Sequence, residues 1–217
     1  MTRVKICCIS SIEEARLAAR LGASALGLVS KMPSGPSVIP EALVTEIAAA
    51  VPSSVDTFLL TSRTDSEGII AQQHRCRVST IQLCDRVSPL VHADLRRTLP
   101  DVTLVQVIHI TGEESVVEAL QVADRVDMLL LDSGNPSLSV KELGGTGRTH
   151  NWSLSARIVE ESSVPVFLAG GLNHSNVDEA IRTVHPFGVD LCSGVRTAGA
   201  LDEERLHAFM EAVEAVG

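Results

Sequence analysis

Residues 126–132 read Val-Asp-Met-Leu-Leu-Leu-Asp, and residues 164–171 read Val-Pro-Val-Phe-Leu-Ala-Gly-Gly. Each is a short apolar run without the polar alternation of a strand that has one face in water. Such runs are typical of parallel strands that are covered on both faces. The first run ends in a carboxylate and the second in two glycines. These stretches therefore predict an α/β fold whose strands end in functional residues.

The same pattern repeats along the whole chain. Short apolar runs predict strands near 3–9, 25–30, 55–61, 79–83, 102–108, 127–132, 165–168 and 188–192. Amphipathic stretches predict helices near 11–21, 40–50, 65–75, 88–97, 113–123, 153–161, 175–184 and 201–215. Ser11 and Ser175 have the residue type and position of helix N-caps, and Gly22 is expected to end the first helix.

Eight strand–helix units in 217 residues favour a closed (β/α)₈ barrel, a TIM barrel near its minimum size. An open doubly wound sheet is the weaker alternative, because it would leave edge strands. No Gly-, Ser- or Pro-rich linker divides the chain, so we expect residues 1–217 to be a single domain. The longest expected loop, residues 133–151, follows the sixth strand, and long loops of this kind tend to be functional.

Composition narrows the class of partner. The net charge of −9 argues against nonspecific binding to nucleic acid or to an anionic membrane, but it permits a small phosphorylated ligand. No basic leader and no run of about 18 apolar residues is present, so neither a secretory signal nor a membrane span is expected. The five cysteines contain no CxxC motif and predict neither a disulfide framework nor a metal site. We therefore expect a cytoplasmic protein.

Glycines cluster where three of the predicted strands end. In a barrel of this kind, chemistry is located at the carboxyl ends of the strands, and the ends of strands seven and eight commonly bind phosphate. Glycine lets backbone amides approach an anion closely beside a helix N-terminus. The alternative is that these glycines only relieve tight turns. Three clusters on one rim favour phosphate, with the candidate residues Gly145, Gly147, Gly170, Gly171, Ser193 and Gly194.

Two further side chains at strand ends are candidates for acid–base chemistry. In a first strand with alternating faces, Lys5, Cys7 and Ile9 share one face, while Cys8 points to the helix layer. An ammonium group near Cys7 would favour the thiolate. Asp132, at the mouth of an apolar strand, is a candidate general acid. The alternatives are that Cys7 is a small buried hydrophobe and that Asp132 caps a loop.

The motifs together resemble the phosphoribosylanthranilate isomerase family of tryptophan biosynthesis over almost the whole chain. The similar segments, in order, are VKICCIS, ALGLVS, IQLCD, LLLDS, GGTGRTHNW, VPVFLAGGLNHSNVDEAI and VDLCSGV. The second half is the more specific, because GGTG, LAGGL and SGV occur there together. The resemblance implies a (β/α)₈ barrel that rearranges a phosphorylated aminoaldose to an aminoketose without a cofactor, as a monomer or homodimer.

The resemblance also assigns roles to particular residues. It implies that Asp132 is the general acid that opens the furanose ring and that Cys7 is the general base that removes the C2′ proton. The six glycine-rim residues named above would hold the substrate phosphate. Lys5, Gln82, Arg63 and Arg148 are weaker candidates for contact with the substrate.

The chain departs from the family pattern at the part that recognises the N-substituent. Family members carry an Arg after strand two that pairs with the anthranilate carboxylate, and Pro36 stands at that place here. Cys84 and Asp85 replace the usual His-Gly after strand four, Cys8 replaces a Gly, and Asn151 replaces an Asp. The candidate replacements for the missing Arg are cations on neighbouring loops: Arg63, Arg86 and Arg148.

Two other functions stay open at this point. One is a catalytically reduced relative that binds a phosphosugar as a sensor or partner module. The other is a different phosphosugar enzyme such as an epimerase or an aldolase. An epimerase of this fold would need several metal ligands at strand ends. An aldolase would need a Schiff-base lysine inside the barrel, for which only Lys5 is available.

Overall fold

The structure, a computed structural model, describes residues 1–216. In this part of the chain eight parallel strands form a closed barrel, in which each strand pairs with the next and the eighth pairs with the first. The strands are β1 (Arg3–Ile6), β2 (Ala25–Val29), β3 (Asp56–Thr61), β4 (Thr80–Leu83), β5 (Thr103–His109), β6 (Met128–Asp132), β7 (Val166–Leu168) and β8 (Gly188–Leu191). The predicted barrel is confirmed, and the open sheet is excluded.

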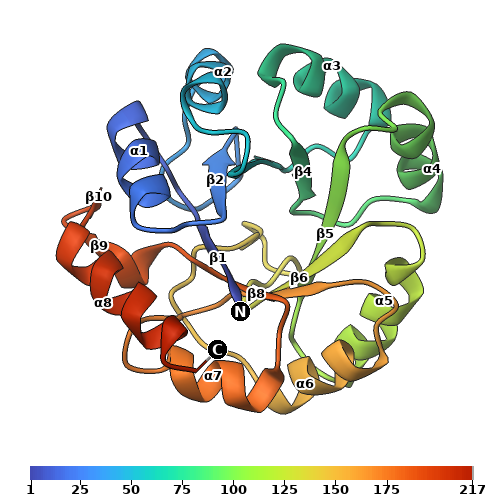
Figure 1. The fold of residues 1–217 in the computed structure, drawn as a ribbon. Coiled ribbons are helices and arrows are strands. Elements are labelled where there is room, and N and C mark those ends of the chain that lie inside the picture. Colours follow the sequence, from blue (N-terminus) through green and yellow to red (C-terminus); the bar gives the residue numbers. More distant parts are fainter. Residues whose placement is uncertain (217) are drawn as a thin grey trace.

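Helices follow the strands in turn and form a ring around the barrel (Figure 1). They are α1 (Ile12–Arg20), α2 (Glu41–Ala50), α3 (Ser66–Cys76), α4 (Pro89–Thr98), α5 (Glu113–Ala123), α6 (Trp152–Glu161), α7 (Val177–Val184) and α8 (Glu203–Glu214). Within residues 1–216, none of these helices is long and apolar enough to cross a membrane.

Local capping explains where several helices begin. The Ser11 side chain accepts a hydrogen bond from the Glu14 amide, which confirms Ser11 as the N-cap of α1. The prediction for Ser175 is wrong, because α7 begins after Asn176. The Ser175 hydroxyl is used within the preceding turn, where it donates to the Asn173 side chain at 2.5 Å.

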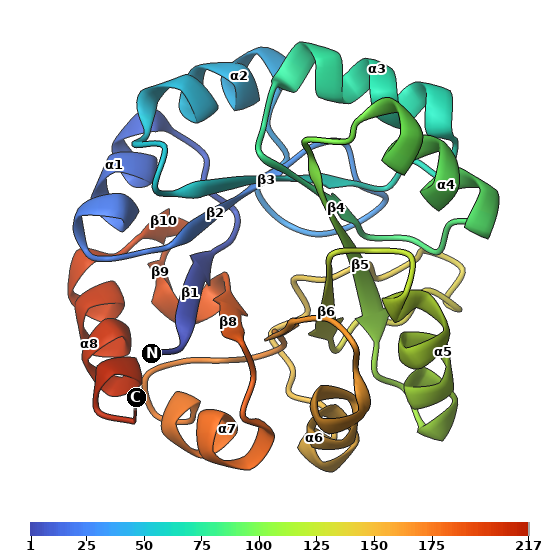
Figure 2. The ribbon, with the colours of Figure 1, turned by 45° about the vertical axis from the view of Figure 1, so that its right-hand side comes forward.

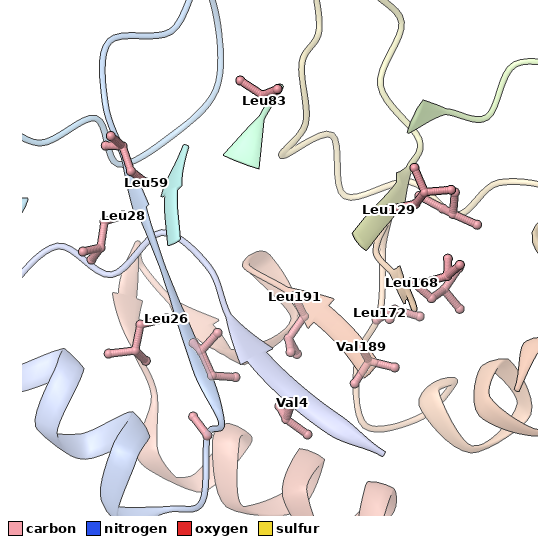
Figure 3. Close-up of a cluster of buried hydrophobic side chains, with 14 of the residues drawn as sticks. Val4, Leu26, Leu28, Leu59, Leu83, Leu129, Leu168, Leu172, Val189 and Leu191 are labelled. Carbon is pink, nitrogen blue, oxygen red and sulfur yellow. The ribbon is translucent and has the colours of Figure 1, made fainter. Parts of the chain in front are cut away.

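The core has two layers. The larger layer lies between the strands and the helices, and Figure 3 shows leucines and valines that project from the outer face of the strands into it. The second layer fills the inside of the barrel, where Phe58 and Phe167 meet edge to face with ring centroids 6.0 Å apart. This double burial explains why the strand sequences are apolar throughout.

A short 3₁₀ helix, η1 (Ser193–Val195), and a small hairpin, β9 (Arg196–Thr197) with β10 (Ala200–Leu201), follow β8. Neither element was predicted from the sequence. The hairpin lies beside α1 (Figure 2), where Arg196 forms a buried ion pair with Glu14 at 2.9 Å. The same guanidinium donates to the carbonyl oxygen of Cys8 at 2.5 Å. This contact fixes the segment that follows β1.

Candidate active site

A cavity opens at the carboxyl ends of the strands, where the fold places functional residues. We call it the main cavity. Residues at the ends of seven strands, all except β5, and residues of the β2–α2 and β6–α6 loops line it. They are Cys7, Cys8, Val29, Met32, Ser34, Gly35, Pro36, Leu60, Gln82, Asp132, Leu143, Gly144, Gly145, Thr146, Gly147, Ala169, Gly170, Gly171, Leu172, Asp190, Leu191, Cys192 and Ser193. The site residues that were predicted on distant strands therefore meet at one place.

Cys7 lies inside the barrel on the same face as Lys5, as strand alternation predicts. Gly27 of β2 packs against both side chains. A Cβ atom on Gly27 would lie 2.9 Å from the Cys7 Sγ and 3.1 Å from the Lys5 Nζ. The thiol and the ammonium are therefore at most about 6 Å apart.

Lys5 is completely buried and pairs with Asp190 of β8, with Nζ and Oδ1 2.9 Å apart. Burial works against the charged amine, but the Asp190 carboxylate outweighs it and raises the pKa of Lys5 above its usual value. The ammonium also lies 5.2 Å from the centre of the Phe58 ring. Lys5 is thus held as a permanent cation beneath the cavity, which is unsuited to a Schiff-base nucleophile.

Cys8 corrects the prediction that it faces the helix layer. Strand β1 ends at Ile6, and Cys8 adopts a left-handed backbone with a φ of 64°. This conformation ends the alternation, so that Cys8 turns into the main cavity and Ile9 packs in the outer core instead. The Cys8 Sγ lies 3.9 Å from the Cys7 Sγ. A non-glycine residue pays a conformational cost in this region, which is why a glycine would suit the position.

Asp132 ends β6 and is buried at the edge of the main cavity. Its Oδ1 accepts a hydrogen bond from the Ser133 amide at 2.7 Å. Its Oδ2 faces Gly144, where an added Cβ would lie 2.7 Å away. The carboxylate is thus fixed through one oxygen, while backbone without a side chain covers the other.

Five of the six predicted phosphate residues line one rim of the cavity, and the sixth, Gly194, lies next to the rim residue Ser193 but does not line the cavity. Gly145, Gly147, Gly170 and Gly171 all have positive φ, between 64° and 86°, so their turns favour glycine. The backbone of residues 148–149 packs directly on Gly171, where a Cβ would lie 2.7 Å from the Arg148 carbonyl carbon. Ser193 begins η1 at this rim, and Gly194 packs against the Leu172 carbonyl oxygen. Backbone amides are thereby available at the ends of β7 and β8, as an anion site requires.

Two loops meet over the cavity. The Ser34 hydroxyl of the β2–α2 loop donates to the Lys141 carbonyl oxygen of the β6–α6 loop at 2.7 Å. Pro36 packs on Gly145, where an added Cβ would lie 2.8 Å from the proline Cδ. The loop after strand six is therefore part of the site, as its length suggested.

The other predicted polar contacts lie in different places. Gln82 lines the main cavity and is buried, and its Oε1 has no hydrogen-bond partner among the described residues. Arg63 lines a separate neighbouring cavity. Arg148 is exposed and pairs with Glu142, and Arg86 pairs with Glu118, each at 2.5 Å. None of these three arginines lines the main cavity.

Sequence reasoning missed four residues that shape the site: Gly27, Gly144, Asp190 and Arg196. Gly27 and Gly144 leave room for Cys7 and Asp132, respectively. Asp190 holds the charge of Lys5. Only Asp190 carried a usable signal, because it is an acidic residue inside an apolar strand and so requires a buried partner.

The closed barrel with a cavity at the carboxyl ends of its strands is the (β/α)₈ architecture, in which enzymes carry their catalytic groups at that end. Residues 4–212 match the model of the N-(5′-phosphoribosyl)anthranilate (PRA) isomerase family. The chain belongs to this family.

Individual relatives agree with the family match. N-(5′-phosphoribosyl)anthranilate isomerase 2 of Methanosarcina mazei is 35% identical over 204 residues, covering 93% of this chain and 89% of the relative. The crystal structure of phosphoribosyl anthranilate isomerase from Thermotoga maritima has 27% identity and a TM-score of 0.84, covering 99% of this chain and 100% of that chain.

A further similar structure contains a ligand. It is a phosphoribosyl anthranilate isomerase in complex with reduced 1-(o-carboxyphenylamino)-1-deoxyribulose 5-phosphate, with 25% identity and a TM-score of 0.82 over 99% of this chain and 100% of that chain. The aldose–ketose isomerase class that the motifs implied is thus confirmed at the level of the family.

Proposed function

We propose that this chain isomerises an N-substituted phosphoribosylamine of the phosphoribosylanthranilate type to the corresponding aminoketose. The observation that carries the proposal is the main cavity, which is lined together by the Cys7 thiol, the Asp132 carboxyl group and the glycine rim. An aldose-to-ketose rearrangement needs one acid, one base and a phosphate anchor. The cavity offers a group for each role.

The reaction starts at Asp132. Its carboxyl group protonates the furanose ring oxygen, and the ring opens to a Schiff base at C1′. The Cys7 thiolate then removes the proton from C2′, and the resulting enolamine tautomerises to the ketose. The Lys5 ammonium, which is paired with Asp190, lies within about 6 Å of the Cys7 thiol. Asp132 gives one proton and Cys7 takes one, so substrate and product are isomers and the reaction requires no external electron donor or acceptor.

The substrate phosphate is held at the glycine rim by backbone amides. A dianion bound there would be stabilised by amide dipoles rather than by side-chain cations, since no Lys or Arg lines this part of the cavity in the described chain. We expect the enzyme to act in the cytoplasm as a monomer or homodimer. A relative from Thermotoga maritima is described as dimeric.

Turnover of phosphoribosylanthranilate by the purified chain tests the proposal. The substrate is fluorescent, and we expect its fluorescence to decay at a rate proportional to the enzyme concentration. The Cys7→Ala variant should lose this activity. A wild-type protein that binds phosphate analogues in calorimetry but never consumes the substrate would instead indicate a sensor and contradict the proposal.

A further inference from the structure

Among residues 1–216, no positive side chain lines the part of the main cavity that faces the N-substituent. With the phosphate at the ends of β7 and β8, the substituent on C1′ points toward the opposite wall, formed by β2, β3, β4 and the two covering loops. This wall, which we call the apolar wall, consists of Val29, Met32, Pro36, Leu60 and Leu143. Val29, Leu60 and Leu143 are buried, so the wall is a fixed apolar surface.

The charged groups that line the main cavity are both acidic, Asp132 and Asp190. Lys5 lies beneath them, and its ammonium group is already paired with the Asp190 carboxylate. Arg196, the other buried cation close to the site, is committed to Glu14 and to the Cys8 carbonyl oxygen. A carboxylate on the N-substituent would therefore leave water without gaining a cationic partner, which disfavours the charged form.

Cations do occur beyond the apolar wall. Lys31, Arg63 and Lys141 line a neighbouring cavity, and Met32 and Leu143 line both cavities and stand between them. Lys141 pairs there with the buried carboxylate of Asp85 at 2.5 Å. A substituent held against the apolar wall would have to displace Met32 or Leu143 to reach these cations.

Ser34 and Gln82 are neutral polar residues that adjoin the apolar wall, and the Ser34 hydroxyl already donates to the Lys141 carbonyl oxygen. Gln82 of β4 is paired with Leu60 of β3. Its side chain is buried, and its Oε1 has no hydrogen-bond partner among the described residues. A buried acceptor without a partner points to a ligand that supplies a donor. The N–H between the sugar and the ring is such a donor, and it carries no charge.

We propose that the enzyme binds the N-substituent of its substrate as an apolar aryl ring, with Gln82 as the polar contact. No cationic side chain binds a carboxylate on that ring. The inference rests on the proposed isomerase function and narrows its substrate class. N-aryl phosphoribosylamines are then substrates whether or not the ring carries a carboxylate. Selectivity comes from the shape of the apolar wall.

The test compares two substrates that differ in charge but hardly in shape, the 2-carboxyphenyl and the 2-carbamoylphenyl phosphoribosylamines. The ketose product of both is quantified by chromatography. A cationic side chain that bound the carboxylate would raise kcat/KM for the charged substrate over that for the amide by about 10- to 150-fold, which corresponds to the energy of a hydrogen bond to a charged group. We expect no such preference, with kcat/KM for the carboxylate equal to or below that for the amide.

A charge added at the apolar wall provides the second arm. Pro36→Arg should raise kcat/KM for the carboxylate at least tenfold relative to the amide. The matched control is Pro33→Arg on the same loop, since Pro33 lines only the neighbouring cavity and its variant should leave the ratio unchanged.

Two results would overturn the inference. One is a wild-type preference for the carboxylate above tenfold, with Arg63→Gln and Lys141→Gln identifying the cation responsible if either variant abolishes that preference. The other is turnover of neither substrate, which refutes the proposed isomerase function itself and the inference with it.

Discussion

Gly27 provides a direct test of how precisely Cys7 must be placed. A Cβ on this residue would lie 2.9 Å from the Cys7 Sγ and 3.0 Å from the Cys7 Cα, whereas ordinary van der Waals contact begins at 3.4 Å. Gly27→Ala must therefore move the thiol by at least about 0.5 Å. Displacements of about 1 Å in a catalytic group cost about 100-fold, so we expect kcat to fall by about 10- to 100-fold.

The glycine rim is not touched by this substitution, so KM should change little. Overpacking should lower the free energy of unfolding by about 1–3 kcal/mol. Steady-state fluorescence kinetics and thermal unfolding measure the two effects separately. Gly112→Ala is the control. The atoms nearest to an added Cβ on Gly112 belong to the flexible carboxylate of Glu114, and neither residue lines the main cavity. A folded Gly27→Ala protein with wild-type kcat would refute the reasoning.

Three further predictions concern the surroundings of the site. The free energy of unfolding, measured by urea denaturation, should be about 1 kcal/mol higher for Cys8→Gly than for Cys8→Ala, since a left-handed backbone disfavours alanine. Equal stability of the two variants would contradict the left-handed conformation at this position. Burial works against the Glu14 carboxylate, but Arg196 outweighs it and lowers the pKa of Glu14. The stabilisation is thus present at pH 7 and lost as the pH falls below the unfolded value near 4.3. Glu14→Gln should lower the unfolding free energy by about 2 kcal/mol at pH 7, and this difference should shrink as the pH is lowered through the depressed pKa of Glu14; a difference that stays constant with pH would count against the ion pair. Gly144→Ala, with its φ of 133° and its Cβ 2.7 Å from Asp132, should lower kcat by tenfold or more in the same fluorescence assay, and an unchanged kcat would show that Asp132 does not need its present position.

The fold could be predicted because each strand of this barrel is buried on both faces. In the strand that ends in Asp132, the residues that face the inner and the outer core layers are both apolar. This pattern is typical of a parallel strand that is covered on both faces. The helix N-cap at Ser11 was equally readable, because capping is a local interaction. At Ser175 the local signal misled, since the hydroxyl has a better partner in Asn173 within the same turn.

The positions of the site residues were predictable only where the alternation of side chains along a β-strand continues. Alternation placed Lys5 and Cys7 correctly on one face, but it failed at Cys8, where a positive φ ends the strand pattern. Arg196, which acts through contacts with residues distant in the sequence, carried no local signal. Arg196 reaches the Cys8 carbonyl oxygen across 188 positions of sequence, and only the closed barrel brings these residues together.

The most direct test of the account is the kinetics of Cys7→Ser with phosphoribosylanthranilate. Serine keeps the size and the hydrogen-bonding capacity of the side chain but is a far weaker source of an anionic base at neutral pH. The account predicts a fall in kcat of about 10²- to 10⁴-fold, with an unchanged affinity for a phosphorylated product analogue in calorimetry. A Cys7→Ser enzyme that retains wild-type kcat would contradict the assignment of Cys7 as the general base.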